Sequence, residues 1–196
     1  LTRCFMERFK KILLVTEQGE GQKTAFERAV ELAIKNQGQL TILDLPDKIP
    51  EQKKHLLGKL FSKELDEVMV RDRGNYLESL VDPVRQQLPI KIQTVKGEPS
   101  HEIIKAVLHD NYDLVIKTSQ PHHSFKTLLF GSTDMHLLRK CPCPVCIIKP
   151  DKKRKFKRIL VAVDIEPSSD DQTMDAFNLE LMEIATELAS YESSEL

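Results

Sequence analysis

Gly131, Ser132 and Thr133 stand where a polar loop gives way to a stretch with helical spacing. The first backbone N–H groups of a helix have no partner within it, and they bind phosphates and other anions well. Ser and Thr also favour this position for a simpler reason, because their hydroxyl groups cap the helix. The residues alone therefore leave two interpretations open: an anion site or an ordinary helix cap.

Two adjacent histidines, His122 and His123, lie in the loop before this helix start. Imidazole titrates near neutral pH and can contact a ligand, but consecutive side chains seldom converge on one metal ion. A polar loop that faces solvent is the simpler interpretation. Asp134 and His136 are two positions apart in the helix, so they do not share a face and form no catalytic pair. We therefore expect no catalytic residue, bound metal or cofactor.

The four cysteines are unevenly spaced, because Cys4 is alone whereas Cys141, Cys143 and Cys146 crowd into "CPCPVC". This spacing does not suit a spread disulfide framework, so a cytoplasmic protein is expected. Structural zinc usually takes four ligands in paired knuckles, and no fourth ligand is evident. Thiols that pack as small apolar side chains are the simpler interpretation.

Composition narrows the class of protein. The chain has 196 residues, 40% of them hydrophobic and 30% charged, with a formal net charge of −1. This gives enough chain for one good core and no general attraction to nucleic acid or to an anionic membrane. No apolar run approaches the roughly 20 residues of a membrane span, and no signal-peptide region is evident. Residues 149–158 contain seven Lys or Arg; without a nucleic-acid-binding motif, we interpret them as a linker.

Strand-like and helix-like stretches alternate along the first 150 residues. Apolar runs of strand length occupy 12–15, 39–45, 90–95, 113–117 and 144–149, and helical spacing occupies 23–38, 51–88, 99–111 and 132–140. This alternation predicts an open parallel sheet with helices on both faces. Ligands of such sheets bind beyond the carboxyl ends of the strands, which is where the loop after 113–117 begins.

Single residues sharpen this assignment. Pro83 is expected to kink or break the helix over 51–88, and Gly38 to cap the end of the helix over 23–38. Alternating polarity makes 90–95 an edge strand. In the helix over 99–111, the residues expected to face the core are Ile103, Ile104, Val107 and Leu108.

The chain contains an internal repeat. The motif "FKKILLVTE" at Phe9 returns as "FKRILVAVD" at Phe156, and helical spacing follows both copies. Charge changes near the same boundary, because residues 164–196 contain ten Asp or Glu and no Lys or Arg. We expect an N-terminal extension, a complete domain, a basic linker and the truncated start of a second domain, over residues 1–8, 9–150, 151–156 and 157–196.

Residues 9–149 resemble the universal stress protein family, and 156–196 resemble a second start of it. In that family a Gly, two residues, a second Gly and nine residues precede Gly-Ser or Gly-Thr, and a helix then leads into a "CPV" strand. Here "GSTDMHLLRKCPCPV" matches the later part, whereas Thr118 and Pro121 replace the two glycines. Glycine lets the backbone bend tightly around a phosphate, and proline also lacks an N–H donor.

The resemblance implies a doubly wound α/β fold with a five-stranded parallel sheet of order 3-2-1-4-5 and a degenerate ATP-type loop. The family's Asp after the first strand is Glu17 here, and Asp164 corresponds to it in the second copy. The positions of the degenerate ligand and phosphate site are Glu17, Thr118, Pro121, His122, His123, Gly131, Ser132 and Thr133. The resemblance also implies pairing through the fifth strand, in a homodimer or with the second domain of an intact tandem, by Val145, Cys146, Ile147 and Ile148.

The expected function is non-enzymatic: a part in the stress response, with a small molecule or another protein as the partner. Retained binding of ATP or AMP, with or without weak nucleotide hydrolysis, is the alternative. An enzyme related by fold would carry its histidine motif after the first strand, where "TEQGEGQKT" has no histidine. A scaffold without any ligand is a third class. The residues after Asp164 are expected to be disordered or swapped between chains.

Overall fold

A computed structural model describes residues 8–17, 21–46, 59–119, 132–149, 157–163 and 171–192. The chain falls into two compact units, Leu1–Asp151 and Lys152–Leu196, and each is described by itself. Pro121, His122, His123, Gly131 and Asp164 lie outside the described residues, as does the first part of the helix expected over 51–88.

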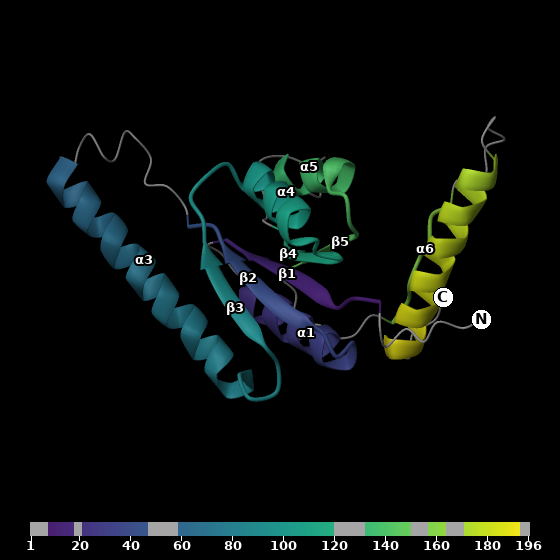
Figure 1. Cartoon of the computed structure of the whole chain (residues 1–196), viewed down its shortest axis with the longest axis horizontal. Helices are drawn as coiled ribbons and strands as arrows, with labels where there is room; N and C mark the ends of the chain where they lie inside the picture. The colour runs from purple at the N-terminus through teal and green to yellow at the C-terminus, as the bar shows by residue number, and fades with distance from the viewer. Residues whose placement is uncertain are drawn as a thin grey trace. The chain divides into compact units, whose positions relative to one another are not determined.

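The first unit is built on a parallel sheet of five strands (Figure 1). The order is β3-β2-β1-β4-β5, which confirms the predicted fold class and places β3 at an edge. The strands β1 and β2 are buried along almost their whole length, as their continuous apolar runs indicate. Their bounds are β1 Lys11–Thr16, β2 Gln39–Asp44, β3 Ile90–Thr94, β4 Leu114–Thr118 and β5 Val145–Ile148.

In the described part of this unit, four helices cover the two faces of the sheet. One hydrophobic cluster joins α1 and the last turns of α3 to the sheet, and a second cluster joins α4 and α5 to the opposite face (Figure 1). The alternation of side chains along each strand decides which cluster a residue enters. The helices span α1 Gln22–Lys35, α3 Lys59–Val81, α4 Pro99–Asp110 and α5 Ser132–Lys140.

The ends of the helices show which single-residue predictions hold. The helix α3 stops at Val81, and a short 3₁₀ turn, η2, runs through Asp82–Val84, so Pro83 breaks the helix as predicted. The prediction that Gly38 caps α1 was wrong. The residue with positive φ after α1 is Gln37, at 49°. Gly38 is needed for a different reason, because its backbone passes close to the carbonyl groups of Phe9 and Lys10.

The helix α4 begins with a side-chain cap. The carboxylate of Glu98 accepts hydrogen bonds from the backbone N–H groups of Ser100 and His101, at 3.2 and 2.8 Å. These bonds satisfy donors that the helix leaves free at its start.

The prediction that Leu108 faces the core was wrong, because its side chain is 63% exposed. Leu108 directly follows the buried Val107, and one step along a helix rotates the side chain away from the face that Val107 presents to the sheet.

The second unit contains the helix α6, Asp171–Glu192. The helical spacing predicted after the second copy is confirmed and the expectation of disorder was wrong for this segment, whereas an exchange of it between chains stays a prediction. The copied strand motif behaves differently from its first copy, because residues 159–163 form no strand and Leu160 is 96% exposed. A strand needs neighbours to pair its backbone groups, and no strand ladder includes these residues.

Replacement of Gly38 by Ala is expected to lower the free energy of unfolding by about 1–3 kcal/mol. An added Cβ would lie 2.7 Å from the Lys10 oxygen and 2.9 Å from the Phe9 oxygen, both of which belong to the backbone. Urea denaturation measures this change. The matched control is Gly74→Ala in α3, where a Cβ meets no atom within 4 Å. That change is expected to stabilise by about 0.5–1 kcal/mol, and equal effects at the two sites would contradict the argument.

Candidate functional site

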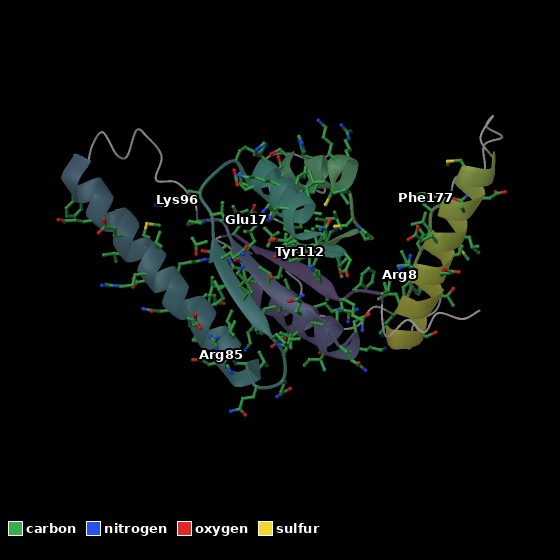
Figure 2. The ribbon with its side chains drawn as sticks, viewed as in Figure 1. Arg8, Glu17, Arg85, Lys96, Tyr112 and Phe177 are labelled. Atoms are coloured by element: carbon green, nitrogen blue, oxygen red, sulfur yellow. The ribbon has the colours of Figure 1, made fainter. Side chains whose placement is uncertain are left out.

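Polar and charged side chains gather where the central strands end. In the parallel sheet Thr16 pairs in register with Asp44, and Val15 with Lys117. The carboxyl ends of β1, β2 and β4 therefore lie side by side along one edge of the sheet, the edge that runs across the strand ends rather than along the outer strands β3 and β5. Glu17 follows β1 at the same edge (Figure 2). Open α/β sheets place their ligand sites at this edge, so these residues define the candidate site.

Lys117 is the centre of the site on the α4–α5 face. Its ammonium nitrogen lies 2.9 Å from Glu17 Oε2 and 2.8 Å from Asp134 Oδ1, and it donates to the carbonyl oxygen of Thr118 at 3.1 Å. The side chains of Lys117 and Asp134 are only 2% and 1% exposed, and that of Glu17 is 12% exposed. We call Glu17, Lys117 and Asp134 the lysine cluster.

The geometry of the lysine cluster follows from the fold. Side chains alternate across a strand, so Val115, which packs in the α4–α5 cluster, places Lys117 on the same face. Asp134 lies in the first turn of α5, which covers that face. Glu17 comes two residues after Val15, which also packs there. Three separate elements therefore bring their charges to one point.

A second polar group lies at the same edge on the α3 face. The guanidinium of Arg73 lies 2.8 Å from Asp44 Oδ1, which also accepts a hydrogen bond from the Thr16 hydroxyl at 2.9 Å. Arg73 donates a further bond, 2.9 Å long, to the backbone oxygen of Glu17, which Gln22 also contacts. The backbone oxygen of Glu17 thus accepts hydrogen bonds from side chains of α3 and α1, while the side chain of the same residue contacts Lys117.

A buried ammonium is stable only when its desolvation is offset by partners. Moving an ion out of water costs several kcal/mol even after relaxation, and the cost is recovered only with good geometry and further hydrogen bonds. Lys117 has two carboxylates and a carbonyl within 3.1 Å. Both carboxylates of the lysine cluster are thus engaged with this ammonium, and an anion at the same point would meet two negative charges.

Four residues of the predicted ligand site lie in the described part of the chain, and their binding role stays a prediction. Glu17 joins the lysine cluster, and Thr118 takes part through its carbonyl group. Ser132 and Thr133 are the first two residues of α5, one exposed and the other partly buried. The roles predicted for Pro121, His122, His123, Gly131 and Asp164 stay predictions, because these residues lie outside the described part of the chain.

Sequence reasoning missed most of the charged residues that meet here. Asp134 entered it only as a residue that does not pair with His136, and Lys117, Asp44 and Arg73 did not enter it. One signal was present: Lys117 ends an otherwise apolar strand with the pattern of a buried element. A lysine in such a strand requires a partner of opposite charge, although the sequence does not name it.

The fifth strand lies beside β4 at the edge of the sheet. Val145, Cys146 and Ile147 are partly exposed, and Ile148 is buried. The carbonyl groups of Pro144 and Ile148 accept hydrogen bonds from β4 and the residue after it. Residues of a strand alternate in direction, so the backbone groups of Val145 and Ile147 point away from β4.

Two kinds of site are not found in the described part of the chain. No three His, Cys, Asp or Glu residues there are grouped so that they could hold a metal ion. None of the helices described is both long enough and apolar enough to cross a membrane.

Comparison with known proteins shows the family to which this fold belongs. A model of the universal stress protein family matches residues 8–149. The chain belongs to the universal stress protein family. The universal stress protein E homolog of Haemophilus influenzae is 30% identical over 191 residues, which cover 93% of this chain and 60% of that protein. The chain spans about three fifths of the length of such curated relatives.

Solved structures of universal stress proteins share the fold. A putative universal stress protein from Pseudomonas aeruginosa UCBPP-PA14 aligns over 97% of this chain and 61% of its own, with a TM-score of 0.71 and 20% identity. A universal stress protein solved in complex with cAMP aligns over 74% of this chain and all of its own (100%), with a TM-score of 0.51 and 14% identity. At these identities the likeness is one of fold.

Replacement of Lys117 by Met is expected to lower the free energy of unfolding at pH 7 by about 3–5 kcal/mol, because the carboxylates lose the ammonium between them. Addition of Asp134→Asn to this variant is expected to restore part of the loss, since the neutral amide no longer needs that cation whereas Glu17 still does. Urea denaturation of the two single variants and the double variant measures the coupling.

The matched control is Lys96→Met, because Lys96 is an exposed lysine of the same domain (Figure 2). Its replacement is expected to change stability by no more than about 0.5 kcal/mol. A Lys117→Met protein as stable as the control would show that the lysine cluster contributes nothing to the folded state.

Proposed function

We propose that residues 9–150 are the first domain of a tandem universal stress protein, and that this domain acts in the stress response without catalysis. It binds a small ligand or a partner protein, and its ATP-type site is degenerate. The tandem arrangement is supported by the repeated motif at Phe156 and by the greater length of the curated relatives. The degenerate site is supported above all by one observation, the lysine cluster.

The lysine cluster occupies the place where a phosphate would approach. In the family pattern the phosphate loop leaves β4 at the position of Thr118, directly after Lys117. The ammonium of Lys117 already contacts two carboxylates. The start of α5 would be the natural anion site, and Asp134 brings a carboxylate into that first turn. A phosphate there would meet two carboxylates and would have to displace one of them.

Retained nucleotide binding is the second candidate, and one observation favours it. Lysine is a common ligand of phosphate groups, and Lys117 lies beside the first turn of α5. Another universal stress protein was solved with cAMP. For this candidate to hold, nucleotide phosphates would have to draw Lys117 away from Glu17 or Asp134.

Titration of the purified chain with Mg-ATP, AMP and cAMP, followed by calorimetry and native mass spectrometry, tests the two candidates. A degenerate site predicts Kd values weaker than about 1 mM, which corresponds to a binding free energy of no more than about 4 kcal/mol. The universal stress protein that was solved with cAMP serves as the positive control.

Two variants make this test specific to Lys117. If Lys117 is a phosphate ligand, Asp134→Asn frees its charge and strengthens binding, whereas Lys117→Met abolishes it. If the site is degenerate, neither variant changes the absence of binding. A micromolar Kd for the unaltered chain would contradict the degenerate site.

The remaining parts of the proposal rest on the cysteines and on the chemistry of the site. Free thiols at Cys141, Cys143 and Cys146 fit a reducing compartment such as the cytoplasm. A non-enzymatic role fits the lysine cluster, whose two carboxylates are already engaged by an ammonium rather than placed to act on a substrate. Neither nucleic acid nor a membrane is proposed as a partner.

The partner surface is the outer edge of β5, in a homodimer of this chain or against the second domain of an intact tandem. An edge strand with free N–H and C=O groups is a template for pairing. Light scattering after size exclusion is expected to give a dimer at micromolar concentration. Ile147→Pro is expected to give a monomer, because it removes an outward N–H group and leaves the bonds with β4 in place.

Ile147→Val is the control for this variant, because it keeps the N–H group and a β-branched side chain. It is expected to remain dimeric. A monomer for the unaltered chain, or a dimer for Ile147→Pro, would show that copies of the chain do not pair through β5.

A further inference from the structure

Two cysteines face each other in the connection between α5 and β5. The sulfur atoms of Cys141 and Cys143 are 3.7 Å apart. Both residues are partly exposed, and Pro142 and Pro144 beside them are exposed. Both thiols pack against the α4–α5 cluster, whereas Cys146 packs against the cluster on the opposite face of the sheet. Cys141 and Cys143 therefore form a pair that excludes Cys146, and we call them the thiol pair.

The two thiols of the pair have different acidities. The pKa of Cys141 is lowered to about 7, mainly by a hydrogen bond from the Cys143 thiol. Burial opposes this shift, and a hydrogen bond from the Cys143 backbone N–H assists it. The same hydrogen bond, with burial and the charges of Cys141 and Asp113, raises the pKa of Cys143. Burial raises the pKa of Cys146. Cys141 thus loses its proton first, around neutral pH, while Cys143 stays the protonated thiol that donates to it.

We propose that the thiol pair is an oxidation site, which low-molecular-weight disulfides of the glutathione type convert to an intramolecular Cys141–Cys143 disulfide. The two sulfur atoms already lie in contact and need to approach to about 2.05 Å to bond. Both residues are partly exposed, as the approach of a small oxidant requires. This site is separate from the proposed binding function and stands whether or not a nucleotide binds.

The reaction balances with the oxidant alone. The Cys141 thiolate attacks one sulfur of oxidised glutathione, so that a mixed disulfide forms, the oxidant's S–S bond breaks and one glutathione thiolate leaves. Cys143 then gives up its proton and attacks the Cys141 sulfur, which releases the second glutathione as a thiolate. Two electrons pass from the protein to the oxidant. The Cys143 proton ends on one glutathione thiol, and the solvent gives the other glutathione the proton that Cys141 had released to form its thiolate.

The thiol pair suits both steps. A thiol attacks a disulfide best when its pKa is near the ambient pH, as is the case for Cys141. The pKa of Cys143 is high mainly because of its hydrogen bond to Cys141. Formation of the mixed disulfide removes the negative charge from Cys141, so this cause is lost and Cys143 becomes easier to deprotonate when its own attack is due.

The experiment uses the full chain with Cys4→Ser and Cys146→Ser, so that the thiol pair holds its only thiols. The protein is incubated with oxidised glutathione at pH 7, quenched with acid and weighed by intact mass spectrometry. The expected product has lost two hydrogen atoms and carries no glutathione. Addition of Cys143→Ser is expected to stop the reaction at one glutathione on Cys141. A product with two glutathiones, a disulfide between two chains or no reaction would overturn the proposal.

A second measurement separates the thiol pair from two ordinary cysteines. The rate at which iodoacetamide alkylates Cys141 is expected to rise with pH around a midpoint near 7. Cys143→Ala removes the thiol donor, so the midpoint is expected to move toward the usual value of about 8.5, with alkylation at pH 7 about threefold slower. Cys143→Ser keeps a hydroxyl donor and is expected to lie between the two. Equal midpoints in all three proteins would show that the two thiols do not interact, and would overturn the assignment.

Discussion

The buried ammonium of Lys117 is the constraint on which the candidate site depends. It lies on a central strand of the sheet, where the side chain is 2% exposed and water cannot solvate the charge. Carboxylates must therefore come to it from neighbouring elements. Glu17 arrives from the end of β1 and Asp134 from the first turn of α5. The Lys117 ammonium thus constrains both the position of α5 over the sheet and the direction of the chain after β1.

This constraint bears directly on what the edge of the sheet can bind. A helix start near the carboxyl ends of parallel strands usually attracts anions. Here the first turn of α5 holds its own carboxylate, and the ammonium of Lys117 lies 2.8 Å from it. The chain has the family fold, with a buried ion pair at this edge. Fold and ligand preference can separate because the sheet sets where a site lies and the side chains set what it accepts.

The fold was predictable from the sequence because its signals are local. Apolar runs located β1 and β2, and α5 has the predicted bounds, Ser132–Lys140. The lysine cluster was not predictable in the same way: the implied strand order puts β1 beside β4, but the register of the two strands and the placement of Asp134 over them decide which side chains meet. The two errors at Gly38 and Leu108 have a similar origin. The close backbone approach at Gly38 and the rotation of α4 on the sheet both depend on tertiary packing. The spacing of apolar residues in the sequence does not reveal that packing.

The helix α5 separates the two unusual chemical features of the domain. Asp134 lies in its first turn, and the thiol pair begins directly after its last residue. Between them Leu137 is fully buried in the α4–α5 cluster, so the middle of the helix is fixed to the sheet. Closure of the thiol pair requires each sulfur to move by roughly an ångström, which the exposed turn around Pro142 can take up. Oxidation would therefore change the surface next to β5 and leave the lysine cluster in place.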